Sequence, residues 1–116
     1  MPIMFGKTFM SDPDRAADRK LWRQRMAGND KQGILRALTG VIERKPIYDE
    51  LGRIALPTLI LVGDEDVATV PAKARRIHQA IAGSRLITIP RAGHTSSVEQ
   101  PQAVSAAIAE FLASVA

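Results

Sequence analysis

Residues 56–69 read LPTLILVGDEDVAT, and this stretch decides the fold. Its first half, residues 57–62, is short, rich in β-branched and apolar side chains on both faces, and bounded by Pro57 and Gly63. A strand that is apolar all round is typical of a parallel sheet that is covered on both sides. The sequence therefore predicts a buried strand over 57–62, followed at once by an acidic turn.

The pattern toward the C-terminus predicts three more elements. Residues 71–82 and 101–113 have helical spacing, and a second short apolar strand lies between them over 85–89. The side chains expected to face inward on the two helices are Ala74, Ile77, Ile81, Val104, Ala107, Ile108, Phe111 and Leu112. A strand–helix–strand unit with a right-handed crossover places its two strands side by side and parallel. The expected fold class is α/β, with a β-α-β-α unit and parallel strands.

Two helices are expected in the N-terminal part. The first begins at Asp12, whose side chain suits the N-cap, and runs to about Ala27, where Gly28 ends it. The second runs from near Asp30 to Lys45, before a proline. It carries one apolar stripe at helical spacing, made of Ile34, Leu35, Leu38, Val41 and Ile42. We therefore expect a helical segment over 1–46 and the β-α-β-α part over 47–116.

A sheet of two buried strands is incomplete by itself. Parallel sheets are stable when they are broad and covered on both faces, so a neighbour of the strand over 57–62 is missing. We expect the chain to form a homo-oligomer through this exposed strand edge, most simply a symmetric dimer that is joined edge to edge or that exchanges its N-terminal helices. The alternative is that the helices of residues 12–44 fold back over the open sheet.

The loops after the two predicted strands hold an acid and a histidine. Open α/β sheets place their sites at the carboxyl ends of the strands. Asp64 and Asp66 follow the first strand, and His94 follows the second. If the strands are adjacent, a carboxylate and an imidazole share one sheet edge, where the carboxylate can fix the histidine tautomer for general-base work. Taken singly, Asp66 and His94 could be ordinary turn and loop residues.

Residues 56–112 resemble the end of an α/β-hydrolase, in the group of 3-oxoadipate enol-lactonases and related carboxylesterases. The resemblance rests on the Gly-Asp-x-Asp turn at 63–66, the Gly-His pair at 93–94, the spacing between them and the closing helix. It implies that Asp66 is the triad acid, that Asp64 is a turn residue, and that His94 is general base and then general acid. Residues 1–46 would be a cap remnant. The implied reaction is hydrolysis of a small-molecule carboxylic ester or lactone, with no cofactor and no metal.

The chain departs from that family in one important respect. It has no Gly-x-Ser-x-Gly motif, the strand-to-helix turn that carries the nucleophile in α/β-hydrolases. We therefore expect a C-terminal hydrolase segment that is inactive alone, whether truncated in the gene or cut from a longer protein. The alternative is a non-catalytic, self-associating module.

The composition limits which other classes of protein the chain could belong to. With 46% hydrophobic and 24% charged residues the chain is that of an ordinary globular protein. Without cysteine, and with two histidines, a metal site is not expected. The longest apolar run is about half of what a spanning helix needs, and no signal sequence is recognised, so a cytoplasmic location is the default expectation. The net charge of +4 is concentrated in residues 1–46, where basic side chains alternate with aspartates. This argues against binding to nucleic acid or other anionic partners.

Overall fold

The computed structural model describes residues 1–116, and its centre is a two-stranded parallel sheet. Strand β1 (Leu59–Gly63) pairs with β2 (Arg85–Ile89), and Leu61 lies opposite Ile87. β2 has the predicted bounds, whereas β1 begins two residues later than predicted. The reason lies in Thr58, whose hydroxyl donates to the carbonyl of Leu56 at 2.9 Å and so forms a local turn before the strand.

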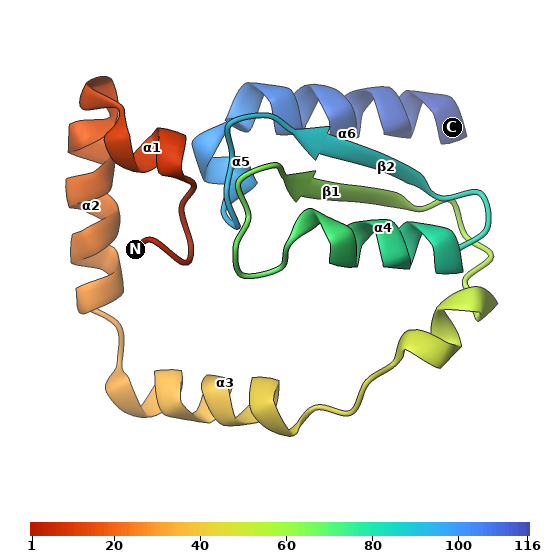
Figure 1. Cartoon of the computed structure of the whole chain (residues 1–116), viewed down its shortest axis with the longest axis horizontal. Helices are drawn as coiled ribbons and strands as arrows, with labels where there is room; N and C mark the ends of the chain where they lie inside the picture. The colour runs from red at the N-terminus through yellow and green to blue at the C-terminus, as the bar shows by residue number, and fades with distance from the viewer.

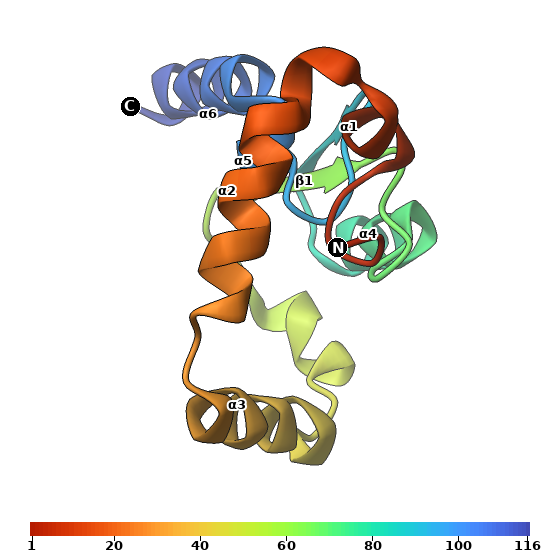
Figure 2. The same cartoon turned by 90° about the vertical axis from the view of Figure 1, so that its left-hand side faces the viewer.

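Two helices sandwich this sheet. Helix α4 (Pro71–Ala80) connects the strands, and α6 (Pro101–Val115) follows β2. In Figure 1 α4 and α6 flank the strands on opposite sides, and the turned view of Figure 2 agrees. The core between sheet and α6 is formed by Ile89, Ala92 and Val104, against which Leu61, Ile87 and Ala103 pack. The structure thus confirms the predicted α/β class with parallel strands.

The N-terminal part consists of short helices that extend from this unit. They are α1 (Lys7–Ser11), a 3-10 turn (Pro13–Arg15), α2 (Ala16–Ala27), α3 (Lys31–Glu43) and a second 3-10 turn (Tyr48–Arg53). Helix α3 begins next to Asp30, close to the predicted start, and the Asp30 carboxylate caps it by accepting from the N–H of Gly33 at 2.5 Å. Asp12 also caps, but the turn it begins is 3-10 and the α-helix starts at Ala16.

Aromatic side chains fix the first residues of the chain to helices α1 and α2. Phe5 and Phe9 are buried and stack with ring centroids 4.7 Å apart, and Trp22 of α2 lies 6.1 Å from Phe5. The prediction that the first helix begins at Asp12 is therefore wrong, because α1 (Lys7–Ser11) precedes it. Helix α1 has too few residues to show a period, and only Phe9 of it is buried.

Helix α3 does not cover the sheet. Its whole apolar stripe is exposed, from 45% for Ile34 to 74% for Ile42. The alternative in which the N-terminal helices fold back over the strands is thus wrong, and Figure 1 shows α3 well separated from α4 and the strands. On α6, Ile108 and Leu112 are also exposed, contrary to prediction, because two strands are too narrow to cover the stripe of this helix.

The molecule exposes more surface than a compact chain of its size. Its accessible surface is 8308 Å², against about 6,200 Å² for a folded monomer of this mass. Its radius of gyration is 16.1 Å, against about 13 Å. The excess, on the order of 2,000 Å², lies in the extended helices and the narrow sheet, and it is comparable to a protein–protein interface.

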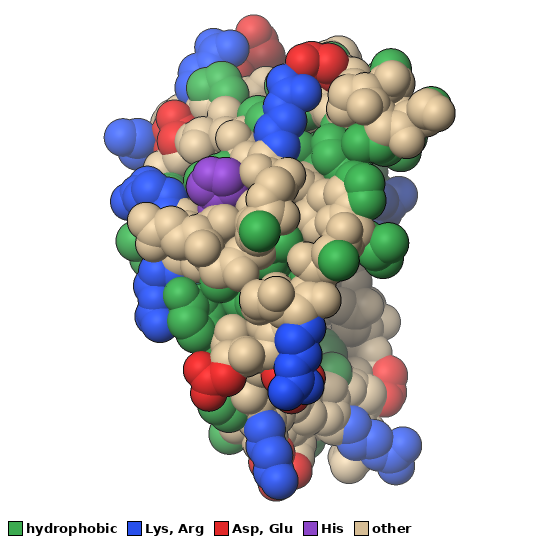
Figure 3. Space-filling view, turned by 90° about the vertical axis from the view of Figure 1, so that its right-hand side faces the viewer, with side chains coloured by type: hydrophobic (Ala, Val, Ile, Leu, Met, Phe, Trp, Pro, Cys, Tyr) green, Lys and Arg blue, Asp and Glu red, His purple; other side chains and the backbone are tan.

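Two surface properties bear on partners. No helix has both the length and the apolar character needed to cross a membrane. On the face shown in Figure 3, Lys and Arg side chains are scattered among acidic and hydrophobic ones and form no continuous basic patch.

Candidate functional site

The site is built from two loops that follow the strands. The turn after β1 and the loop after β2 are joined by backbone hydrogen bonds, from Asp64 N to Ile89 O at 3.0 Å and from Glu65 N to Ala92 O at 2.9 Å. The carboxylate of Asp64 also accepts from the N–H of Ala92 at 3.3 Å. The two loops therefore lie side by side, as parallel pairing of the strands predicts.

Glycines allow these loops to touch. A Cβ atom on Gly63 would overlap the carbonyl oxygens of Ala92 and Gly93, so a side chain at Gly63 would push the loops apart. In the loop after β2 the chain turns at Arg91, whose φ of 57° lies in the left-handed region. This conformation costs a non-glycine residue roughly 1–2 kcal/mol. The Gly-Asp-x-Asp and Gly-His motifs thus mark one backbone contact.

The contact brings Asp66 and His94 together. Asp66 Oδ2 lies 3.0 Å from His94 Nδ1. Asp66 is 6% exposed, whereas the His94 side chain is 36% exposed. A buried carboxylate on Nδ1 leaves Nε2 as the other nitrogen of the ring for proton transfer. The geometry matches the predicted pair, while their catalytic roles stay a prediction.

Four hydrogen bonds hold the Asp66 carboxylate. Oδ1 accepts from the backbone N–H of Ala68 at 2.8 Å and of Thr69 at 2.9 Å. Oδ2 accepts from the Thr69 hydroxyl at 2.7 Å and is bonded to His94. Burial raises the pKa of Asp66, but the hydrogen bonds from Thr69, His94 and Ala68 lower this pKa by more than burial raises it. The pKa of Asp66 therefore lies below its ordinary value of 3.8.

The lowered pKa of Asp66 predicts a pH dependence of stability. A group whose pKa is depressed by folding contributes stability above its unfolded pKa, and that contribution is lost as pH falls through the folded pKa. We expect the unfolding free energy to fall as the pH drops below about 4, and to fall less steeply in Asp66→Asn. Urea titrations across this range measure it, with the exposed Asp64→Asn as control. An unchanged slope in Asp66→Asn would contradict the prediction.

The contacts of three polar residues of this region were not predicted from the sequence. The hydroxyl of Thr69 is 3.1 Å from His94 Nδ1 as well as bonded to Asp66. Glu65 accepts from Thr8 N at 2.8 Å, and Glu99 is 1% exposed. Thr69 could have been found, since its N–H lies three residues after an aspartate, a common turn pattern. The bonds from Thr8 to Glu65 and from Gly6 to Glu99 join residues that are distant in the chain, so they leave no local signal.

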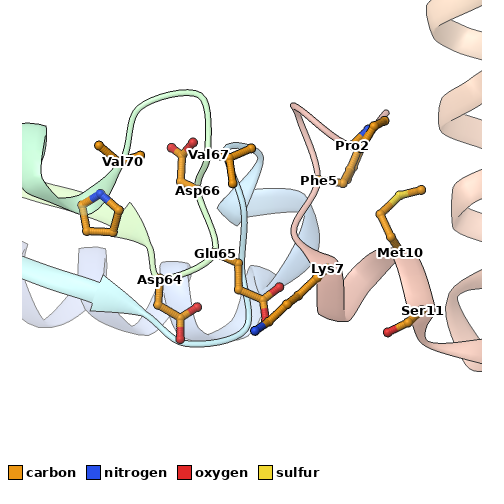
Figure 4. Close-up of a pocket in the computed structure, with 11 residues that line it drawn as sticks. Pro2, Phe5, Lys7, Met10, Ser11, Asp64, Glu65, Asp66, Val67 and Val70 are labelled. Atoms are coloured by element: carbon orange, nitrogen blue, oxygen red, sulfur yellow. The ribbon is translucent and has the colours of Figure 1, made fainter.

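Two hollows adjoin the pair. The larger, of about 720 Å³, lies between the acidic turn and the first residues of the chain; Figure 4 shows Pro2, Phe5 and Met10 on one side of it and Asp64, Glu65 and Asp66 on the other. The smaller, of about 370 Å³, runs along residues 60–63 of β1 and includes His94. Asp66 lines both. No three acidic or histidine side chains converge in the way that metal ligands would.

The fold and the site define a class: a parallel α/β unit that joins a buried acid to a histidine at the carboxyl ends of its strands. The family model Abhydrolase_4, described as TAP-like protein, matches residues 40–115. This chain belongs to the α/β-hydrolase family.

Individual relatives agree with this membership. Mycobacterium tuberculosis BpoC, provisionally named a non-heme bromoperoxidase, is 40% identical over 72 residues, which are 62% of this chain and 26% of that protein. An esterase from Thermogutta terrifontis superposes with a TM-score of 0.83 at 31% identity, over 98% of this chain and 41% of its own. The enol-lactonase from Burkholderia xenovorans gives 0.84 at 28% identity, over 97% and 42%. The chain therefore spans well under half the length of the relatives that it matches.

Proposed function

We propose that this chain supplies the acid and the histidine of a serine hydrolase that acts on carboxylic esters or lactones. One observation carries the proposal: the 3.0 Å contact between Asp66 Oδ2 and His94 Nδ1, which joins a buried carboxylate to a partly exposed ring. In this arrangement the acid orients the base and the base faces the reactants.

The residues then act in a fixed order. His94 Nε2 takes the proton of the serine hydroxyl as its oxygen attacks the substrate carbonyl, and returns that proton to the leaving alcohol or enol. Asp66 remains ionised, holds the tautomer with the proton on Nδ1 and stabilises the imidazolium. Attack by water on the acyl-serine repeats the sequence and releases the acid.

The serine must come from another segment, because the chain has no Gly-x-Ser-x-Gly motif. We propose that this segment pairs with the free edge of β1. Two features support this: β1 has a strand on one side only, and the smaller hollow runs along β1 as far as His94. A strand in that position would bring its C-terminal turn close to the histidine.

The proposed substrate class rests on the relatives and on the larger hollow. The similar solved structures include an esterase and an enol-lactonase. A volume of about 720 Å³ suits a small molecule, and the apolar side chains of Phe5, Met10 and Val67 in its lining suit the hydrocarbon part of an ester.

We also propose the division into a cap-like segment, residues 1–46, and the core part, residues 47–116. The exposed apolar stripe of α3 supports it, since such a stripe needs a partner.

A chimera tests the proposed function. This chain replaces the matching part of the Thermogutta terrifontis esterase, which retains its own nucleophile segment. We expect the chimera to hydrolyse a p-nitrophenyl ester and to react with a fluorophosphonate probe, because all three triad members are then present. The isolated chain should do neither, since it lacks the nucleophile and the oxyanion hole.

Two controls show whether the activity depends on the nucleophile that the esterase segment supplies. Alanine in place of the nucleophile in the chimera must abolish labelling. A folded chimera without activity would contradict the proposed function. Stoichiometric labelling of a serine in the isolated chain would show that the nucleophile lies within these residues.

A second candidate function is self-association without catalysis. It is favoured by the large accessible surface and by the single strand partner of β1. A second copy of the chain could occupy the same edge as the nucleophile segment.

A further inference from the structure

Glu99 is a charged side chain buried close to the histidine, at 1% exposure. It ends α5 (Ser96–Glu99), the short helix that follows the His94 loop. Its Oε2 accepts from Gly93 N at 3.0 Å and its Oε1 accepts from the Thr95 hydroxyl at 2.9 Å. One carboxylate therefore holds the residues on both sides of His94.

The same carboxylate reaches the beginning of the chain. Glu99 Oε2 also accepts from Gly6 N at 2.8 Å, although the two residues are 93 positions apart. Beside this bond, the N–H of Thr95 donates to the carbonyl of Met4 at 3.0 Å, and the Thr95 hydroxyl oxygen lies 3.0 Å from the same carbonyl. The segment Met4–Gly6 is thus bonded to the histidine loop directly and through Glu99.

Backbone packing makes this junction close. A Cβ atom on Gly93 would overlap the Gly6 nitrogen and approach the Phe5 carbonyl carbon to 2.8 Å. A Cβ atom on Gly6 would lie 2.9 Å from Gly93 N and 2.5 Å from Glu65 Oε2. Gly6 has an ordinary φ of −66°, so the neighbours alone exclude a side chain there.

Arg15 holds the far end of the same loop. Its guanidinium donates to the carbonyls of Glu99 at 3.0 Å and Val98 at 3.1 Å, and it lies over the Phe9 ring at 4.6 Å. Residues 4–15, which lead into α2, are therefore hydrogen-bonded to both ends of the segment 93–99.

We infer that Glu99 is a positioning residue, which fixes the backbone on both sides of His94 and locks it to the segment before α2. A shift of the N-terminal helices would be transmitted to His94 through Met4–Gly6 and Glu99. The catalytic meaning of this inference rests on the proposed function, whereas the junction itself does not. Neither the family motif at Asp66 nor the Gly-His pair assigns this role.

The test uses the 116-residue chain and readouts that need no activity. Glu99→Ala is compared with Glu110→Ala, an exposed glutamate on α6 that pairs with Arg85 at the surface. We expect hydrogen exchange of the Gly6 and Gly93 amides to accelerate at least about tenfold in Glu99→Ala only. The ring ¹⁵N shifts of His94 should at the same time lose their single-tautomer pattern.

Glu99→Gln serves as the conservative rescue. Its amide oxygen can still accept from both glycine N–H groups while its NH₂ donates to Thr95, so exchange should stay within about threefold of the parent chain. Equal loss of protection in Glu99→Gln and Glu99→Ala would overturn the inference, as would an unchanged exchange in Glu99→Ala.

A second variant probes the junction from its other side and covers the case in which Glu99→Ala does not fold. Gly6→Ala should move the His94 ring signals, whereas Gly40→Ala, which has no neighbour within 4 Å, should leave them in place. Unmoved His94 signals in Gly6→Ala would overturn the coupling.

In the chimera, Glu99→Ala should lower kcat at least about tenfold with a smaller change in KM. An inactive chimera with these NMR effects would refute the proposed function and leave the junction standing.

Discussion

His94→Ala in the chimera is expected to lower kcat by on the order of 10⁶, and Asp66→Asn by on the order of 10⁴. In the proposed mechanism the histidine performs both proton transfers, so its loss would remove general-base and general-acid catalysis together. Asp66 would act through the histidine. An asparagine there can still accept from the N–H groups of Ala68 and Thr69, but it turns an NH₂ group toward His94 Nδ1 and favours the wrong tautomer.

The matched control is Asp64→Asn. Asp64 is exposed and its carboxylate accepts from a single backbone N–H, that of Ala92 at 3.3 Å. We expect less than about tenfold loss in this variant, because one long bond to a loop is at stake. Steady-state kinetics of the three variants, with circular dichroism to confirm folding, measures the effects. If Asp64→Asn proved more damaging than Asp66→Asn, the assignment within the turn would be reversed.

The sequence predicted this pair because its signals are local. The apolar run before Gly63 and the second strand over 85–89 are both recognised from neighbouring residues alone. Parallel adjacency of the strands then brings an acidic turn to His94, and the resemblance to α/β-hydrolases selects Asp66 within that turn; the 3.0 Å contact agrees with that expectation. The class of fold followed from the same two strands.

The surroundings of the pair were not predictable in this way. The burial of Glu99 depends on Gly6 and Gly93, and a bond across 93 positions leaves no trace in local spacing. The exposed stripes of α3 and α6 show the opposite failure. The helical spacing of their apolar residues predicts which face of each helix is suited to burial. Burial of that face also requires a partner surface, which two strands do not provide.

The isolated chain is expected to be a dimer, at about twice the monomer mass, at micromolar concentration. β1 is apolar throughout and has an open edge, whereas the edge strand β2 carries the charged Arg85, which discourages edge pairing. A two-fold axis that joins β1 to its copy satisfies both edges at once. Sedimentation or light scattering across a wide concentration range measures the mass.

A proline at the start of β1 tests which edge is used. The carbonyl of Thr58 and the N–H of Asp64 both form hydrogen bonds with the β2 segment, so the backbone groups of the even-numbered residues of β1 point toward β2. The N–H of Leu59 therefore points toward the open edge. Leu59→Pro removes that donor at the first strand position, where proline is tolerated. We expect it to weaken association at least about tenfold, and Leu59→Ala, which keeps the N–H, to weaken it less.

The dimer and the hydrolase compete for one surface. If the nucleophile segment pairs with the open edge of β1, the chimera that contains it has no edge to offer and should be monomeric at concentrations where the isolated chain is dimeric. Leu59→Pro should then reduce both the association of the isolated chain and the activity of the chimera, because the same edge is used in each. A monomeric isolated chain with high thermal stability at every concentration would refute the dimer. An active chimera that is insensitive to Leu59→Pro would place the nucleophile segment on a different surface.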